Sequence, residues 1–396
     1  MTVFLPFYAV YGGSMKKIIS VLGATGSVGR QALDVARERD FLVDFLCANR
    51  DAALIESYAR EFKPKTVAMA DPEAARDLKQ RLADTSVKVL SGFEGIEEGI
   101  LTSESEVAVN SILGEAGLMP TLTVINSGKR LALANKESLV IAGDIVMQAA
   151  KDKGAEIIPV DSEHSAIFQS LKSGKNEEIK RLILTASGGP FFGKTKEELK
   201  RVSLEETLAH PTWKMGKKIT VDSATLMNKG FEIIEAVHLF GVPADKVEVV
   251  VHRESILHSA VEYIDNSIIA EMSVPDMKMC VQYAVDYPDR RPSSAKELDL
   301  FEVGALTFRR PDTDAFPFLD LARECITLGG AMPAVMNAAD EVAVDAFLRG
   351  RIAFYDIFRV VTDTVKGMSD MASVHSLGGI IAADREARAR ALELTK

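Results

Sequence analysis

The stretch Ile18-Ile-Ser-Val-Leu22-Gly-Ala-Thr-Gly26-Ser-Val-Gly29 decides the fold of the first part of this chain. Its first five residues form a short apolar run with β-branched side chains, typical of a buried strand. The glycines at positions 23, 26 and 29 permit a tight turn, and the helix that follows offers free N–H groups to an anion. The spacing predicts a strand–turn–helix unit that binds a dinucleotide pyrophosphate. A glycine turn that only lets a helix pack on a strand gives the same pattern, so the context has to decide.

The context favours a sheet of parallel strands. Helical spacing follows the turn over Arg30–Arg39, and further apolar runs of strand length alternate with helical segments. These runs are Leu42–Ala48, Thr66–Ala70, Val107–Ile112, Leu131–Ala134 and Glu156–Val160. Short buried strands that alternate with helices predict an α/β fold, with a Rossmann-like, doubly wound parallel sheet over residues 15–160.

The composition limits the kind of protein. A chain of 396 residues is expected to form two or three domains, and 47% hydrophobic with 26% charged residues is typical of a soluble globular protein. The net charge of −10 argues against a nucleic-acid binder or an anionic-membrane binder, and no stretch is long and apolar enough to span a bilayer. The cysteines Cys47, Cys280 and Cys325 lack paired or metal-binding spacing, which indicates reduced thiols in a cytoplasmic protein.

The rest of the chain changes pattern twice. Residues 161–288 mix strand-like runs at Leu182–Thr185, Lys246–His252 and Ser267–Met272 with a helix from about Ala224 to Phe240. Near the end, Phe354, Ile357, Phe358 and Val361 have helical spacing. We therefore predict a disordered extension over 1–14 ahead of a natural start at Met15, a nucleotide-binding domain over 15–160, an α+β catalytic domain over 161–288, a linker over 289–312 and a C-terminal helical domain over 313–396.

The end of the second predicted strand bears on the choice of nucleotide. NAD-specific sites usually place an acid there, on the ribose hydroxyl. Here the strand ends in Ala48-Asn49-Arg50, and a cation favours a 2′-phosphate and hence NADP. A surface Arg50 that pairs with Asp51 explains the same residues equally well.

Two acidic pieces suggest a metal site. Asp161 and Glu163 directly follow a predicted strand, and on an extended segment both carboxylates face the same side. Glu232 is the proposed third ligand, one helical turn after Asn228. Hard oxygen ligands of this kind suit Mg²⁺ or Mn²⁺. Taken singly, Asp-x-Glu is usually solvated surface, and Lys229 with Glu232 is an ordinary surface pair.

A phosphate-binding loop and a lid complete the pattern. Ser187-Gly-Gly189 offers a hydroxyl and backbone amides to an anion, and Ser223 adds a second hydroxyl. His210 and Trp213 lie in residues 203–218, which have no clear periodicity and which we interpret as a mobile lid. A fixed loop with Trp213 as a buried anchor is the alternative.

Six motifs in this order resemble one enzyme family. They are Gly23-Ala-Thr-Gly-Ser-Val-Gly29, Ala134-Asn-Lys-Glu137, Val160-Asp-Ser-Glu-His164, Thr185-Ala-Ser-Gly-Gly-Pro190, His210-Pro-Thr-Trp-Lys-Met215 and Val221-Asp-Ser-Ala-Thr-Leu-Met-Asn-Lys-Gly-Phe-Glu232. Together they resemble the 1-deoxy-D-xylulose 5-phosphate reductoisomerases, and the resemblance covers residues 15–396. It implies NADPH, a divalent metal (Mn²⁺, Mg²⁺ or Co²⁺), a small sugar-phosphate substrate and a homodimer.

The resemblance also implies roles, residue by residue. Asp161, Glu163 and Glu232 match metal ligands, and with Lys136 and His210 they match the catalytic residues. The substrate contacts matched are Lys136, Ser162, Glu163, Ser187, His210, Trp213, Ser223, Asn228, Lys229 and Glu232. The cofactor contacts matched are Thr25, Gly26, Ser27, Val28, Ala48, Asn49, Arg50, Asn135, Glu137 and Gly216. Ala48, where some members have Gly, and the tip Asn49-Arg50 depart from the family pattern.

The implied reaction is a rearrangement of 1-deoxy-D-xylulose 5-phosphate, by a retro-aldol/aldol route or a ketol shift, followed by NADPH reduction to 2-C-methyl-D-erythritol 4-phosphate. Two other hypotheses remain. A semialdehyde dehydrogenase shares the glycine turn but needs a nucleophilic Cys near a His. A non-catalytic NADP-binding regulator would not need the three carboxylates and a lid together.

Overall fold

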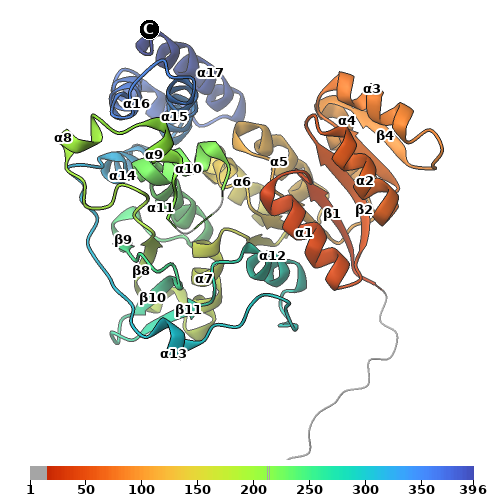
Figure 1. Ribbon diagram of the computed structural model, residues 1–396, viewed down its shortest axis with the longest axis horizontal. Helices are drawn as coiled ribbons and strands as arrows, with labels where there is room; N and C mark the ends of the chain where they lie inside the picture. Colours follow the sequence, from red (N-terminus) through yellow and green to blue (C-terminus); the bar gives the residue numbers. More distant parts are fainter. Residues whose placement is uncertain (1–15, 212, 214) are drawn as a thin grey trace, which may run out of the picture.

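The computed structural model describes residues 16–211, 213 and 215–396 (Figure 1). The predicted extension 1–14 lies outside these residues. Figure 1 shows the N-terminal sheet with its helices on one side of the molecule and the last helices, in blue, on the other. A second, smaller sheet lies below the middle of the view, beside α7 and α11.

The first sheet has seven parallel strands in the order β4-β3-β2-β1-β5-β6-β7. Its strands are β1 (Ile18–Leu22), β2 (Leu42–Ala48), β3 (Thr66–Met69), β4 (Lys88–Ser91), β5 (Val107–Asn110), β6 (Arg130–Leu133) and β7 (Ile157–Pro159). The order reverses between β1 and β5, so their carboxyl ends open a crevice for a ligand. The predicted doubly wound parallel sheet is confirmed. Only β4 escaped the sequence analysis, because it is a short, half-exposed edge strand without an apolar run.

Helices cover both faces of this sheet. The connecting helices are α1 (Ser27–Glu38), α2 (Ala52–Phe62), α3 (Pro72–Arg81), α4 (Gly92–Thr102), α5 (Leu118–Asn126) and α6 (Glu137–Lys153). One face is packed by α1, α2 and α3, and the other by α4, α5 and α6. Helix α12 (Met277–Asp286) joins the first group, because its buried Val281, Ala284 and Val285 pack against this sheet and not against the second one.

The second sheet has the order β11-β10-β8-β9. Its strands are β8 (Ile179–Ala186), β9 (Val247–Val251), β10 (Leu257–Tyr263) and β11 (Ile268–Met272). β8 pairs with β9 in parallel, and the other pairs are antiparallel. Sequence analysis missed β10 because His258, Ser259 and Glu262 interrupt its apolar pattern, although the strand is almost wholly buried.

The helix predicted from Ala224 to Phe240 is instead two helices. They are α10 (Lys217–Thr225) and α11 (Met227–Phe240), separated by Leu226, whose φ of 61° is left-handed. The predicted lid 203–218 therefore ends inside a helix. It also contains the short helix α9 (Leu204–Leu208), capped by Ser203, which the lack of clear periodicity in this segment did not indicate. Its Thr212 and Lys214 lie outside the described residues.

The C-terminal part is helical, as predicted. It comprises α14 (Phe318–Leu328), α15 (Met332–Leu348), α16 (Asp356–Lys366) and α17 (Leu377–Leu394). The predicted linker contains one short helix, α13 (Leu300–Val303), and the chain then runs up the outside of the molecule to α14 (Figure 1). The remaining elements are α7 (Ser162–Ser170), α8 (Lys196–Leu199) and the 3₁₀ turns Gly114–Gly117, Leu171–Ser173, Asn176–Glu178, Ala244–Lys246 and Ser369–Ser373.

Helix α15 connects this part to the rest of the chain, since it packs against α6 and α10 as well as α16 and α17. Buried apolar residues of the first sheet, the second sheet and the C-terminal helices thus form one continuous core. Among the described residues, no helix has both the length and the apolar content needed to cross a membrane.

Candidate functional site

The glycine turn after β1 is open to an anion. Gly26 is the N-cap of α1, and no side chain caps the helix, so its first N–H groups face outward. A Cβ on Gly29 would lie 2.2 Å from the carbonyl oxygen of Gly23, so only glycine permits this tight a turn. Thr25, Ser27 and the partly buried Val28 surround the same helix end. These features fit a dinucleotide pyrophosphate.

The end of β2 lies along the same edge and places Ala48, Asn49 and Arg50 there. Ala48 is buried, whereas Asn49 is exposed and the Arg50 side chain is 79% exposed. Arg50 pairs with Asp71, at 3.0 Å between Nε and Oδ2. The alternative pairing with Asp51 is wrong, because Asp51 caps α2 by accepting from the Leu54 N–H. An exposed guanidinium held by one partly buried partner remains accessible to a 2′-phosphate.

The other predicted cofactor residues lie on two elements. Buried Asn135 follows β6, and its amide nitrogen donates to Glu137 and to the Gly114 carbonyl, both at 3.0 Å. It thus ties the loop after β5 to the start of α6. Gly216 is exposed and is the N-cap of α10, at the end of the lid segment.

Asp161 and Glu163 lie at the carboxyl end of β7, as predicted, but the segment is not extended. Asp161 is the N-cap of α7, and Glu163 lies in its first turn. The expectation that period-two alternation aligns the carboxylates is therefore wrong. They converge because the helix starts here, where its dipole also favours negative charge.

Three carboxylates and two ammonium groups share one buried cluster. Ligand atoms of Asp161, Glu163 and Glu232 lie within 4.8 Å of one another. The Lys136 ammonium contacts Asp161 and donates to Glu232 at 3.0 Å. The Lys229 ammonium donates to Glu163 at 2.8 Å and to Glu232. The Lys229–Glu232 pair is therefore not an ordinary surface pair, because both side chains are almost fully buried.

Burial and neighbouring charges shift the pKa values of groups in this cluster. Burial lowers the pKa of Lys136, but the charges of Asp161 and Glu232 outweigh it and hold the ammonium charged. Burial and the charge of Glu232 raise the pKa of Glu163 to about 7. Three hard oxygen donors from two helices, held together by cations, make a donor set that fits Mg²⁺ or Mn²⁺.

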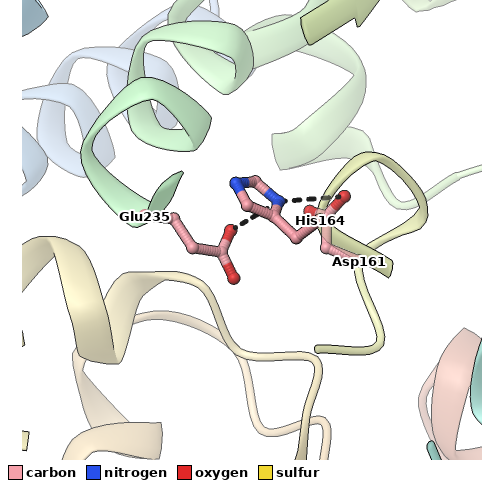
Figure 2. A group of neighbouring side chains, drawn as sticks. All are labelled: Asp161, His164 and Glu235. Atoms are coloured by element: carbon pink, nitrogen blue, oxygen red, sulfur yellow. Dashed lines mark ion pairs between the residues drawn. The ribbon is translucent and has the colours of Figure 1, made fainter. Parts of the chain in front are cut away.

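Two buried residues beside this cluster were not singled out from sequence. The His164 ring lies between the carboxylates of Asp161 and Glu235, with Nδ1 3.8 Å and 3.2 Å from their oxygens (Figure 2). Its Nε2 lies 3.0 Å from the backbone carbonyl of Glu232. The available signals were the i, i+3 spacings of His164 from Asp161 and of Glu235 from Glu232.

A separate pocket suits a phosphate. His210 Nε2 lies 3.0 Å from the Ser187 hydroxyl and 3.1 Å from the Ser223 hydroxyl. The Trp213 N–H donates to His210 Nδ1 at 3.0 Å, so a neutral ring carries its proton on Nε2, facing the two serines. Burial, with the charge of Arg253, lowers the pKa of His210 to about 4.

The loop after β8 completes this pocket. Gly189 has a φ of 63°, and a Cβ there would lie 2.6 Å from the Ser223 carbonyl, so the loop fits tightly against α10. Arg253, which sequence analysis did not identify, donates to the carbonyls of Ser187 and Gly189 and fixes the loop.

The remaining predicted substrate residues lie around these two clusters. The Asn228 amide nitrogen donates to Glu232 at 2.6 Å, which confirms that they share a helix face. The Ser162 hydroxyl donates to Glu163 at 2.5 Å. Trp213 is partly buried, and its ring lies 6.2 Å from that of His258, measured between centroids.

Cys280 does not have the environment of a nucleophile. It lies on α12, and burial, together with the charge of Glu271, raises the pKa of its thiol. An activated thiol requires the opposite shift. The semialdehyde dehydrogenase hypothesis therefore lacks the nucleophilic cysteine that it requires.

Comparisons with known proteins agree with the resemblance found in the sequence. Residues 19–143 match the family model of 1-deoxy-D-xylulose 5-phosphate reductoisomerase, residues 157–240 match its C-terminal domain model, and residues 272–390 match a further DXP reductoisomerase C-terminal domain model. The reductoisomerase of Caldanaerobacter subterraneus subsp. tengcongensis is 50% identical over 95% of this chain and 98% of its own. That of Acetivibrio thermocellus is 51% identical over 96% and 99%.

Solved structures agree. The Zymomonas mobilis reductoisomerase in complex with NADPH is 41% identical, with a TM-score of 0.91 over 96% of this chain and 100% of its own. A DOX-P reductoisomerase in complex with NADPH, fosmidomycin and magnesium is 38% identical, with a TM-score of 0.92 over 96% and 98%. The chain therefore belongs to the 1-deoxy-D-xylulose 5-phosphate reductoisomerase family.

Proposed function

We propose that this chain catalyses the metal-dependent rearrangement and NADPH-dependent reduction of 1-deoxy-D-xylulose 5-phosphate to 2-C-methyl-D-erythritol 4-phosphate, a step of non-mevalonate isoprenoid biosynthesis. The observation that carries the proposal is the buried cluster of Asp161, Glu163 and Glu232, which lies at the carboxyl edge of a nucleotide-binding sheet. A non-catalytic NADP-binding regulator has no use for three carboxylates gathered at that edge.

The three carboxylates would hold the metal, which when bound polarises a carbonyl and stabilises the negative charge that develops on oxygen. In this structure Lys136 and Lys229 neutralise the same oxygens. We propose that Lys136 also contacts the substrate oxygens and handles their charge and protons. Mn²⁺ and Co²⁺ are proposed as alternatives to Mg²⁺, because the oxygen donors accept all three ions.

The substrate would lie between the two clusters. Ser187, Ser223 and the Nε2–H of His210 would bind its phosphate, and neutral His210 adds a donor without requiring a proton from solution. Ser162, Asn228 and Lys229 would donate hydrogen bonds to its hydroxyl oxygens. Their present partners are the carboxylates of Glu163 and Glu232, so each donor already lies beside the proposed metal.

The nucleotide would lie along the carboxyl edge from β2 to β6, and when bound it supplies the hydride. The N–H groups after Gly26 would hold the pyrophosphate, and Arg50 the 2′-phosphate. Asn135, Glu137 and Gly216 would line the end nearest the substrate. The buried hydrogen bonds of Asn135 keep that loop in place.

We also propose that residues 203–218 close over the substrate as a lid, with Trp213 as its apolar cover. The backbone of Trp213 already contacts His210, so lid position and phosphate pocket are linked. The divisions 15–160, 161–288, 289–312 and 313–396 stay proposals, with α12 packed on the first sheet although it falls in the second range.

A homodimer in the cytoplasm is proposed from the family resemblance. β11 is an edge strand of the second sheet, and it exposes Ile268 and Met272 beside Ile264 of the preceding turn. An apolar strand edge is a surface that a second copy can cover. Light scattering should give the mass of two chains, and Ile268→Lys should lower it.

The decisive experiment is the loss of NADPH absorbance when 1-deoxy-D-xylulose 5-phosphate is added, with and without Mg²⁺ or Mn²⁺. We expect loss only with metal, and a product that chromatographs with 2-C-methyl-D-erythritol 4-phosphate. A protein that binds NADPH and metal but never oxidises NADPH with this substrate would refute the proposal.

A further inference from the structure

A second buried charge cluster lies outside the site described above. Lys218, in the first turn of α10, places its ammonium 2.7 Å from Asp222 on the same helix and 2.9 Å from Asp340 on α15. The ammonium also lies 4.9 Å from the centre of the Phe231 ring on α11. One side chain therefore joins the consecutive helices α10 and α11 to α15, which lies more than 90 residues further along the chain.

The two carboxylates depend on this lysine. Asp340 is fully buried and Asp222 almost so. Within the described part of the chain, neither oxygen of Asp340, nor Oδ1 of Asp222, has a hydrogen-bond donor other than the Lys218 ammonium. Burial, together with Asp340, raises the pKa of Asp222 well above its usual range. Buried carboxylates are costly unless they are paired, so without the cation these two acids must take up a proton or move apart, and the contact between α10 and α15 that Lys218 makes is lost in either case.

The position of Lys218 links this cluster to the proposed lid and to the phosphate pocket. The lysine is the last residue of the proposed lid 203–218 and lies two residues after Gly216, the N-cap of α10. Ser223, next to Asp222, contacts His210 of the phosphate pocket at 3.1 Å. Whatever fixes α10 therefore fixes both the end of the lid and one wall of that pocket.

We propose that Lys218 is a positioning residue, which anchors the C-terminal end of the lid to α15 through Asp340 and thereby sets substrate affinity. It touches neither the carboxylate cluster nor the serines of the phosphate pocket in this structure. The C-terminal helices thus act on catalysis by holding α10. This inference rests on the proposed function, and its test includes a readout that needs no turnover.

The test compares Lys218→Met with Lys366→Met. Lys366 is an exposed lysine on α16, outside the proposed lid and both site clusters, so both variants lose one ammonium group by the same substitution. In Lys218→Met, KM for the sugar phosphate should rise roughly tenfold, while kcat and KM for NADPH change much less. Lys366→Met should keep the wild-type values. Equal effects in both variants, or a wild-type KM in Lys218→Met, would overturn the anchor.

A second substitution separates a specific anchor from simple damage. In Lys218→Met, Asp222 and Asp340 are left facing each other without a cation. Adding Asp340→Asn replaces one acid with an amide that can donate to Asp222, so the double variant should recover most of the lost affinity. Val361→Ala serves as a stability control, because it weakens the same C-terminal core at a distance from Lys218. Failure of Asp340→Asn to restore KM, or a raised KM in Val361→Ala, would contradict the proposal.

Quenching of Trp213 fluorescence by acrylamide gives the readout that needs no turnover. Trp213 is the one tryptophan of the sequence. With NADPH and Mg²⁺ bound, it should be more accessible in Lys218→Met than in wild type, and protected again in the double variant. If the wild type lacked reductoisomerase activity, this difference would still stand and only the proposed function would fail. If activity were present and accessibility unchanged, the anchor would fail alone.

Discussion

The carboxylate cluster and the cofactor end of the same sheet edge are built in opposite ways. In the cluster of Asp161, Glu163 and Glu232, each carboxylate is buried or half-buried and faces an ammonium group. At the end of β2, Arg50 is largely exposed and has one partner, Asp71, which also caps α3. The first arrangement holds its groups through several buried charged contacts, whereas the second leaves a long side chain free to adjust.

The buried cluster therefore bears on the chemical step, and the exposed Arg50 bears on the choice of nucleotide. A buried, paired charge is costly to disturb, so substitutions in the cluster should act on the chemical step. An exposed pair contributes little to stability, so Arg50 can be exchanged with loss of nucleotide preference alone. The following predictions test that separation, from the largest expected effect to the smallest.

Neutralising a cluster carboxylate should produce the largest loss. We expect Asp161→Asn and Glu232→Gln each to lower kcat by at least about 100-fold at saturating Mn²⁺, because a lost ligand weakens and misplaces the metal. Steady-state rates check this, with circular dichroism to show that the variants fold. Glu197→Gln, an exposed residue on α8, is the control for the same charge change. Near-native activity in either cluster variant would remove that residue from the ligands.

Removing the lid aromatic should affect turnover without affecting the nucleotide end. Trp213→Ala should bind NADPH with wild-type affinity but lose roughly 10- to 100-fold in kcat/KM, because the site no longer excludes water. In the wild type, fosmidomycin should change Trp213 fluorescence only when the divalent metal is present. An unchanged signal at saturating metal, NADPH and fosmidomycin would indicate the fixed loop.

Arg50→Ala should change nucleotide preference and little else. The ratio of kcat/KM for NADPH to that for NADH should fall about tenfold, because the cation that meets the 2′-phosphate is lost. The same ratio in Arg76→Ala, an exposed arginine on α3, should match the wild type. If Arg50→Ala leaves the ratio unchanged, Asn49 or another group recognises the 2′-phosphate.

The smallest effect concerns acid stability. The pKa of His210 is depressed from 6.5 to about 4, so the unfolded chain binds more protons between these values. His210 therefore lowers the free energy of unfolding progressively as the pH falls from about 6.5 to about 4. At neutral pH it has no such effect. Urea unfolding at pH 7 and pH 5 should show a smaller loss of stability in His210→Gln than in wild type. An equal loss in both proteins would place the acid sensitivity elsewhere.

Local sequence was sufficient for the first sheet and for the set of candidate residues. The glycine turn and the apolar runs predicted six of the seven parallel strands, because buried strands need continuous apolar stretches whatever surrounds them. The family motifs also placed Asp161, Glu163 and Glu232 together before any geometry was known. The surface interpretation of Lys229 and Glu232 was wrong because burial of a charge depends on what packs above it.

Other features depended on contacts between distant segments. Sequence could not show that α12 packs on the first sheet, since its apolar face would suit either sheet. Nor could it choose Asp71 over Asp51 as the partner of Arg50, because the two acids differ only in where the parallel strands place them. In the sequence, His164 and Glu235 were marked only by their spacing from proposed ligands, and only the folded chain brings them to 3.2 Å from each other.

The sequence by itself determined the fold class, the family and the donor chemistry of the site, because these depend on local periodicity and on ordered motifs. The tertiary structure alone decided which charges are buried and which pairs form. Lys218 illustrates the reason: its two partners lie 4 and 122 residues away, and only the packing of α15 against α10 brings Asp340 to 2.9 Å from its ammonium. Electrostatic energies depend on distance and burial in space, which no local pattern contains.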